Sequence, residues 1–253
     1  MHRPTTIPEV LNQLDIIIEQ SIANNDRIGL FAFIYRRTTA EILKEIQLKN
    51  FEDNARLEKL DVAFANLYLD AYNNYINNKP IRKCWEFAFH TKSESLTILQ
   101  HILLGMNAHI NLDLSISTSA TMAGEDLVDI ENDFNTINDI LFSIVNEMQD
   151  RLSKVSRLMF LLDILGKNTD EKIIDFSMRK ARQQAWNSTN LLWSIGNNAN
   201  TEAIDKIDVL VLKLSEIIKS PKSKMLQFAL KVIAKFEEKD VDIIISKLKS
   251  NSF

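Results

Sequence analysis

Residues 96–114 read LTILQHILLGMNAHINLDL. At 100° per residue, the leucine, isoleucine and methionine side chains of this stretch point to every side of a helix. A helix that is apolar all round is buried against other elements over its whole circumference. We therefore predict that residues 93–116 form a helix at the centre of the protein.

Four residues of this predicted helix break the apolar pattern at steps of four: His101, Gly105, His109 and Asp113. Residues four apart lie on one side of a helix, so the three polar side chains form a ladder with a gap at Gly105. Glycine inside a helix costs about 1 kcal/mol relative to alanine. That cost predicts that another helix or a ligand approaches the backbone at Gly105.

A second helix is predicted over residues 53–76, and it supplies partners for the ladder. Asp61 projects from the middle of its apolar stripe, which also contains Tyr68, whereas Asn66, Asp70 and Asn73 lie on the opposite side. A buried imidazole or carboxylate without a partner costs several kcal/mol. We therefore expect the two helices to pack together and to form one polar cluster with these members: Asp61, Tyr68, His101, His109 and Asp113.

Three interpretations of this cluster are open. It is a hydrogen-bond network that fixes how the helices pack, or it is a metal site in which His109, Asp113 and His101 hold one divalent ion, zinc, iron or magnesium. In the second case Asp61 is a further ligand or the carboxylate that orients a histidine. The third interpretation is acid–base catalysis without a metal, in which Asp61 tunes His101 or His109. The candidate catalytic residues are His101, Asp61 and Tyr68.

A weaker motif lies further along the chain. Asp139, Ser143 and Glu147 follow one another at steps of four, which is the ligand spacing of the magnesium triad in class I terpene cyclases. The aspartate-rich D-D-x-x-D motif that accompanies the triad is absent from the sequence. Arg179 and Arg182 are expected in exposed salt bridges. A solvent-facing helix surface therefore explains the triad more simply than a cyclase site does.

Composition sets the fold class. Gly and Pro together number 9 of 253 residues, too few for the turns of a sheet protein. We predict an all-α protein, an orthogonal bundle of about eleven helices around the two central ones. Its main domain covers residues 1–197 and an appended helical subdomain covers residues 198–253. Residues 117–124 lack apolar periodicity and are expected to form a loop.

Charge and hydropathy limit the expected partners. The net charge of −4 and the pI of about 5.7 argue against nucleic acid. No apolar run is long enough to span a membrane, and the start lacks the apolar region of a signal peptide, so we expect a cytoplasmic protein. Residues 206–249 contain 10 lysines, no arginine and 6 acidic residues. Oligomeric state is not predicted by these features.

The chain resembles a bacterial all-helical family of unknown function, DUF5995. The resemblance covers about residues 3–195 and rests on four blocks of sequence: residues 56–66, 99–114, 137–141 and 184–186. It brings no activity with it. A looser resemblance, to the helical zinc phospholipase C and P1 nuclease group, rests on His109 and Asp113 as a His-x-x-x-Asp pair and implies a zinc-dependent hydrolase, although the group's other ligands have no counterpart here.

Three functional hypotheses follow. The first is a metal-dependent hydrolase that acts on a small molecule at the His/Asp cluster. The second is a helical protein without catalytic activity, in which the cluster is structural and a partner docks on residues 117–124 or on the lysine-rich tail. The third is a magnesium-dependent enzyme similar to terpene cyclases.

Overall fold

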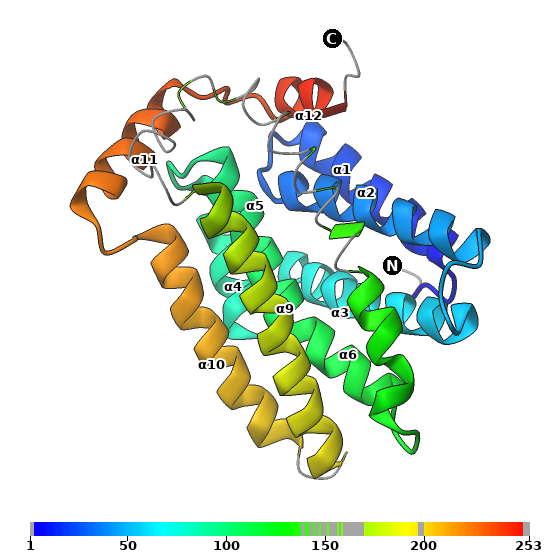
Figure 1. The fold of residues 1–253 in the computed structure, drawn as a ribbon. Helices are drawn as coiled ribbons and strands as arrows, with labels where there is room; N and C mark the ends of the chain where they lie inside the picture. The colour runs from blue at the N-terminus through cyan, green and yellow to red at the C-terminus, as the bar shows by residue number, and fades with distance from the viewer. Residues whose placement is uncertain are drawn as a thin grey trace.

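The computed structural model describes residues 3–137, 140–141, 144, 147, 151, 156, 158, 170–196 and 200–249. These residues contain ten α-helices and no strand, which confirms the all-α prediction (Figure 1). Two further helices are predicted from the sequence, over residues 125–153 and 156–165. Of the first, residues 131–137 are described and are helical, whereas most of the rest and nearly all of the second lie outside the described part of the chain. The helices are α1 (Ile7–Ala23), α2 (Ile28–Gln47), α3 (Asn54–Ile76), α4 (Lys83–His90), α5 (Ile98–Ala108), α6 (Leu114–Thr121), α9 (Asp170–Ile195), α10 (Asn200–Lys219), α11 (Lys224–Phe236) and α12 (Val241–Lys249).

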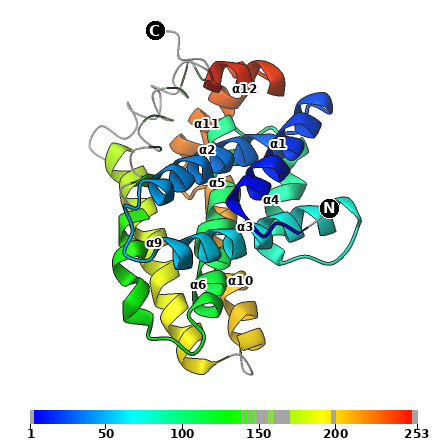
Figure 2. The same ribbon diagram turned by 90° about the vertical axis from the view of Figure 1, so that its right-hand side faces the viewer.

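The predicted central helix is confirmed, but it begins and ends five residues later than predicted, at Ile98 and Thr121. It consists of α5, the π-helix η2 (His109–Asp113) and α6 in succession. Thr97 and Gln100 form a capping box at its start, which fixes Ile98 as the first helical residue instead of Ser93. Figures 1 and 2 show α5 and α6 running through the middle of the bundle, with α1 and α2 on one side and α9 and α10 on another.

The prediction of a loop over residues 117–124 is wrong for residues 117–121, which belong to α6 and are largely buried. The hydroxyls of Ser115, Ser117 and Ser119 donate to carbonyls three residues earlier, Leu112, Leu114 and Ile116. Because these hydroxyls are satisfied within the helix, small polar side chains can be buried in a helix that lacks apolar periodicity. A short turn at residues 122–124 and the 3-10 helix Leu127–Ile130 follow, where a helix from residue 125 was expected.

Helix α3 packs on η2 and α6, the second half of the central helix, and not along α5. Asp53 caps its N-terminus through the backbone N–H of Arg56 at 3.0 Å. Asn66 was expected on the exposed side of α3, yet it is buried because its amide donates to the carbonyl of Pro4 at 3.0 Å. The N-terminal segment therefore covers part of the side that the sequence assigned to solvent.

The last three helices lie on different parts of the bundle. Helix α10 packs against α4 and α5, and α12 packs against α1 and α2. The division at residue 197 into a main domain and an appended subdomain stays a prediction. No helix in the described ranges is both long and apolar enough to cross a membrane.

Candidate functional site

One cavity of about 60 Å³ lies between α2, α3, the central helix and α9. We call it the Asp61 cavity. A single water molecule needs roughly 10–15 Å³ of such space. The cavity therefore has room for several waters or for a compound of a few heavy atoms. Its walls are mostly apolar, and five polar residues interrupt them: Tyr35, Thr38, Asp61, His109 and Arg182.

Asp61 and His109 bring unsatisfied polar atoms to this cavity. Oδ2 of Asp61 and Nε2 of His109 are buried, and neither makes a hydrogen bond within the described part of the chain. Burial raises the pKa of Asp61 to about 7, and the negative charge of Glu58 adds to the shift. The pKa of Tyr35 lies well above its usual value because of burial and then because of the charge of Asp61.

The other side of the His109 ring is held in place. Its Nδ1 lies 3.0 Å from Oδ2 of Asp113, and the same oxygen accepts a hydrogen bond from Nε1 of Trp85 at 3.0 Å. Burial lowers the pKa of His109 and raises that of Asp113. When Nδ1 carries the proton and donates to Asp113, Nε2 is left with a lone pair that can accept a hydrogen bond or bind an ion.

Aromatic rings enclose the His109 imidazole. Phe64 stacks on it with ring centroids 3.6 Å apart and an interplanar angle of 7°, and Tyr35 meets it edge-on at 4.3 Å. Three further rings lie between 5.7 and 6.1 Å: Phe31, Tyr68 and Trp85. Rings on this many sides keep bulk water from the imidazole, and the low local dielectric strengthens each polar contact that it makes.

His109 and Asp113 are the first and last residues of the π-helix, where the backbone widens to i→i+5 hydrogen bonding. Such turns inside α-helices occur frequently at functional sites. Neither apolar periodicity nor residue spacing predicts a π-helix at these positions. On another side of the helix, Asn107 donates to the carbonyl of Val211 at 2.9 Å and to Oγ of Ser215 at 2.8 Å, which fixes the central helix against α10.

His101 does not join this cluster. It lies two turns before His109, roughly 12 Å along the helix axis, and lines a separate pocket of about 20 Å³ beside Arg27 and Lys92. Burial lowers the pKa of His101 to about 3, and the positive charge of Arg27 adds to this effect. The cluster that sequence analysis predicted is therefore divided, with His101 on one side and His109 on the other.

The gap at Gly105 is filled by another helix and not by a ligand. A Cβ atom at Gly105 would lie 2.4 Å from Cγ of Phe31, a residue of α2. Phe31 lines both pockets, so its ring stands between the His101 pocket and the Asp61 cavity. The close approach that glycine predicted is therefore a helix–helix contact.

Tyr68 is fully buried beside the cluster, and it is not among the residues that line the Asp61 cavity. Its hydroxyl has no hydrogen-bond partner within the described residues, and burial raises its pKa well above the usual value. Its ring packs against Phe31 and Trp85, with centroids 5.2 and 5.1 Å away. A direct catalytic role for Tyr68 stays a prediction.

The predicted metal ligands are not gathered at one point. In the part of the chain that the structure describes, no group of three or more His, Cys, Asp or Glu side chains is placed to hold a metal ion. His109 and Asp113 contact each other, while His101 lies in the separate pocket. A divalent ion at His109 would need Nε2 as its ligand, and Asp61 is the carboxylate that lines the same cavity.

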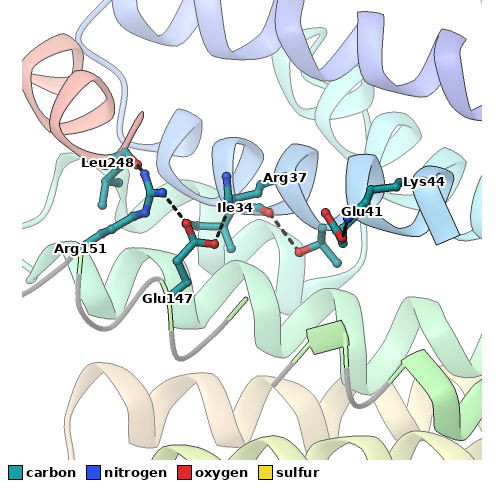
Figure 3. Close-up of polar contacts among 8 residues, drawn as sticks. Ile34, Arg37, Glu41, Lys44, Glu147, Arg151 and Leu248 are labelled. Carbon is teal, nitrogen blue, oxygen red and sulfur yellow. Dashed lines mark hydrogen bonds and ion pairs between the residues drawn. The ribbon is translucent and has the colours of Figure 1, made fainter. Parts of the chain in front are cut away.

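The cyclase triad is only partly described, since Asp139 and Ser143 lie outside the described residues. The Glu147 carboxylate accepts hydrogen bonds from Arg37 of α2 and from Arg151 (Figure 3). Arg151 also donates to the carbonyl of Leu248 in α12 at 2.6 Å. Glu147 thus joins α2 and, through Arg151, α12, which is a structural role.

Three polar residues of the cavity wall were not predicted as site residues: Tyr35, Thr38 and Arg182. Arg182, expected in an exposed salt bridge, is buried: it donates to the carbonyl of Phe134, and its guanidinium lies 4.0 Å from the centre of the Phe134 ring. Burial lowers the pKa of Arg182 to about 9. Ala185 and Thr189 follow Arg182 by three and seven positions, so the three residues lie on one side of α9, and both are buried. This helical spacing of small residues was the available sequence signal that Arg182 faces the interior.

A model of a family of unknown function, DUF5995, matches residues 7–221. The match confirms the resemblance seen in the sequence and extends it to the end of α10. No protein with a curated description and no solved structure matches the chain. The likeness to the zinc phospholipase C and P1 nuclease group therefore stays an expectation.

Proposed function

Because the chain belongs to DUF5995, a family of unknown function, we propose a function from its own residues: the Asp61 cavity binds a small, largely apolar molecule that carries one hydroxyl or carbonyl group. The apolar walls of the cavity favour such a molecule, because moving apolar surface out of water is favourable. The size of the cavity limits the molecule to a few heavy atoms unless side chains move.

The observation that carries the proposal is the pair of unsatisfied atoms, Oδ2 of Asp61 and Nε2 of His109, beside one cavity. An unsatisfied buried polar group costs about 1–3 kcal/mol. A hydroxyl that donates to one of these atoms and accepts from the other, or a carbonyl that accepts from a protonated Asp61, removes that cost. The binding of such a group is therefore favoured over the binding of a hydrocarbon of the same shape.

The chemistry that suits this pair is proton transfer. A general acid or base works best when its pKa is close to the working pH, and the pKa of Asp61 is raised to about 7. Asp61 exchanges a proton with the oxygen of the bound molecule, while Asp113 holds the His109 ring in one orientation. Water is kept away by the rings around His109.

Three probes of nearly equal shape test the proposal: cyclopentanol, cyclopentanone and cyclopentane, each followed by ligand-observed NMR on the full chain. We expect the alcohol and the ketone to bind with a Kd of about 1 mM or tighter and cyclopentane to bind at least about 10-fold more weakly. Equal binding of all three probes, or of none of them up to about 10 mM, contradicts the proposal.

Two matched variants localise the binding. Tyr35→Phe removes a hydroxyl from the cavity wall, whereas Tyr72→Phe removes a hydroxyl that lies 3.4 Å from Oε1 of Gln20, outside the cavity. We expect cyclopentanol binding to weaken in Asp61→Asn and Tyr35→Phe and to stay unchanged in Tyr72→Phe. Loss of binding in all three variants would show a general change in folding and not a local site.

Metal-dependent hydrolysis is the second candidate, and one observation favours it. A histidine that binds a metal usually donates its other ring N–H to a carboxylate, as Nδ1 of His109 is placed to do with Asp113. Zinc, iron or magnesium bound at Nε2 would supply an activated water for hydrolysis of a small molecule. Metal analysis of the purified protein tests this candidate: metal should be lost in His109→Ala and retained in His101→Ala, whose side chain lies in the other pocket.

A further inference from the structure

Helix α11 exposes a stripe of large apolar side chains. Met225, Phe228 and Phe236 have 59%, 69% and 69% of their surface exposed, respectively. At 100° per residue, these three positions and Val232 fall within an arc of about 80° on the helix. Three other side chains of α11 are buried: Ala229, Ile233 and Ala234. The exposed stripe therefore lies directly beside the buried side of the helix, since Ala229 is about 20° from Phe236.

A row of lysines borders this stripe. Lys224, Lys231 and Lys235 are exposed and lie within an arc of about 40° beside the apolar side chains. From residue 217 to residue 236 the sequence contains five lysines and no acidic residue. Along the described ranges, none of the three bordering lysines forms an ion pair with an acidic side chain.

The acidic residues that follow α11 do not neutralise the lysines. Glu237 is buried, and its carboxylate accepts a hydrogen bond from the backbone N–H of Ile98 at 2.8 Å. Glu238 pairs with Lys247 at 3.5 Å. The exposed face of α11 therefore combines bulky apolar side chains with uncompensated positive charge.

We propose that this face of α11 binds the surface of an anionic lipid bilayer. A helix that lies in the membrane interface inserts phenylalanine and other apolar side chains among the acyl chains and places lysines against the headgroups. Lysine side chains reach the phosphates while their methylene stems stay against apolar surface. Figure 1 shows α11 at the edge of the fold, between the end of α10 and α12.

Charge complementarity argues for this partner over a second copy of the chain. The face is positive, the chain as a whole carries a net charge of −4, and two copies of the same face would repel each other. An anionic bilayer supplies negative charge and an apolar interior at once. The proposal is independent of the function suggested for the Asp61 cavity.

Vesicle co-sedimentation of the full chain tests the proposal, with phosphatidylcholine vesicles and with vesicles that also contain about 30% phosphatidylserine. We expect binding to the anionic vesicles, little binding to phosphatidylcholine alone, and weaker binding at high salt. Each lysine near an anionic surface contributes a factor of about five. The triple variant Lys224→Gln, Lys231→Gln, Lys235→Gln should therefore lower the partition coefficient about 100-fold, and Phe228→Ser about 10-fold.

Matched control variants separate this face from general charge and hydrophobicity. Val128 is 67% exposed on the 3-10 helix Leu127–Ile130, and Lys79 and Lys213 are exposed on other segments. Val128→Ser and the double variant Lys79→Gln, Lys213→Gln should bind like the unmodified chain. All substituted side chains are exposed, so thermal unfolding should change little in every variant.

Three results would overturn the proposal. The first is no binding to the anionic vesicles. The second is binding that persists in both α11 variants, because another surface is then responsible. The third is a dimer in light scattering that Phe228→Ser converts to a monomer while the unmodified chain ignores vesicles, which assigns the face to a second copy of the chain.

Discussion

Nδ1 of His109 and Oδ2 of Asp113 lie 3.0 Å apart, with only 3% and 4% of the two side chains exposed. Burial disfavours the charge on each partner, so the pair is stable only while the two contact each other and Trp85. The same contact leaves Nε2 of His109 as the group available to the Asp61 cavity. A structural hydrogen bond therefore determines which atom of His109 is available for function.

Asp113→Ala should lower the free energy of unfolding by about 3 kcal/mol, because the Trp85 N–H and His109 Nδ1 lose their buried partner. Asp113→Asn should cost clearly less, since the amide oxygen can still accept from Trp85. Urea unfolding monitored by circular dichroism measures both values. Equal stability of Asp113→Ala and the unmodified chain would show that the contact is not stabilising.

Asp61→Asn should change the pH dependence of stability. The pKa of Asp61 is about 7 in the folded chain against an ordinary value of 3.8, so the folded state binds more protons between pH 4 and pH 7. Asp61 therefore lowers the free energy of unfolding as pH rises through this window, by about 4 kcal/mol in all. Asp61→Asn removes that loss.

We expect Asp61→Asn to be more stable than the unmodified chain at pH 8 and similar to it at pH 4. Urea unfolding at a series of pH values checks this. Glu58→Gln is a suitable control, because it removes only the smaller contribution to the Asp61 shift. A stability difference that does not vary with pH contradicts a raised pKa at Asp61.

His101→Gln should have the opposite pH dependence. The pKa of His101 is lowered from 6.5 to about 3, so the unfolded state binds more protons between these values and stability falls as pH falls through them. At pH 4 the loss is about 3 kcal/mol, and it is absent above pH 7. His101→Gln should reduce this acid sensitivity, as measured by thermal unfolding at pH 4 and pH 8. A difference of the same size at both values would contradict the lowered pKa.

Gly105→Ala should destabilise the protein by about 1–3 kcal/mol, even though alanine favours a helix, because its Cβ would lie 2.4 Å from Cγ of Phe31. Adding Phe31→Leu should recover part of this loss, since the two residues contact each other. Denaturant unfolding of the two single variants and the double variant gives the coupling. Simple additivity of the two changes would show that Phe31 does not limit the space at Gly105.

Several elements of the fold were predictable because their signals are local. The helix over residues 53–76, the burial of residues 96–114 and the all-helical class each follow from residues close in sequence or from composition. Residues 117–121 were misjudged because their serine hydroxyls bond within the helix itself, a pattern that apolar periodicity does not detect.

The site was only partly predictable. Asp61, His109 and Asp113 stood out as polar residues on apolar helices, and the structure places all three in or beside one cavity. His101 has the same helical spacing, but Phe31 of α2 packs at Gly105 and separates it from His109. Spacing along one helix does not reveal which neighbouring helix lies at each turn.

By itself, the sequence determined the all-helical class, the buried central helix and which polar residues of that helix lie in the protein interior. Periodicity and composition are properties of the chain alone, so they suffice for these three features. The tertiary structure decided which of those residues share a cavity. Which residues share the cavity depends on how α2, α3 and α9 pack around the π-helix. The ring of Phe31, for example, lies against Gly105 and separates His101 from His109.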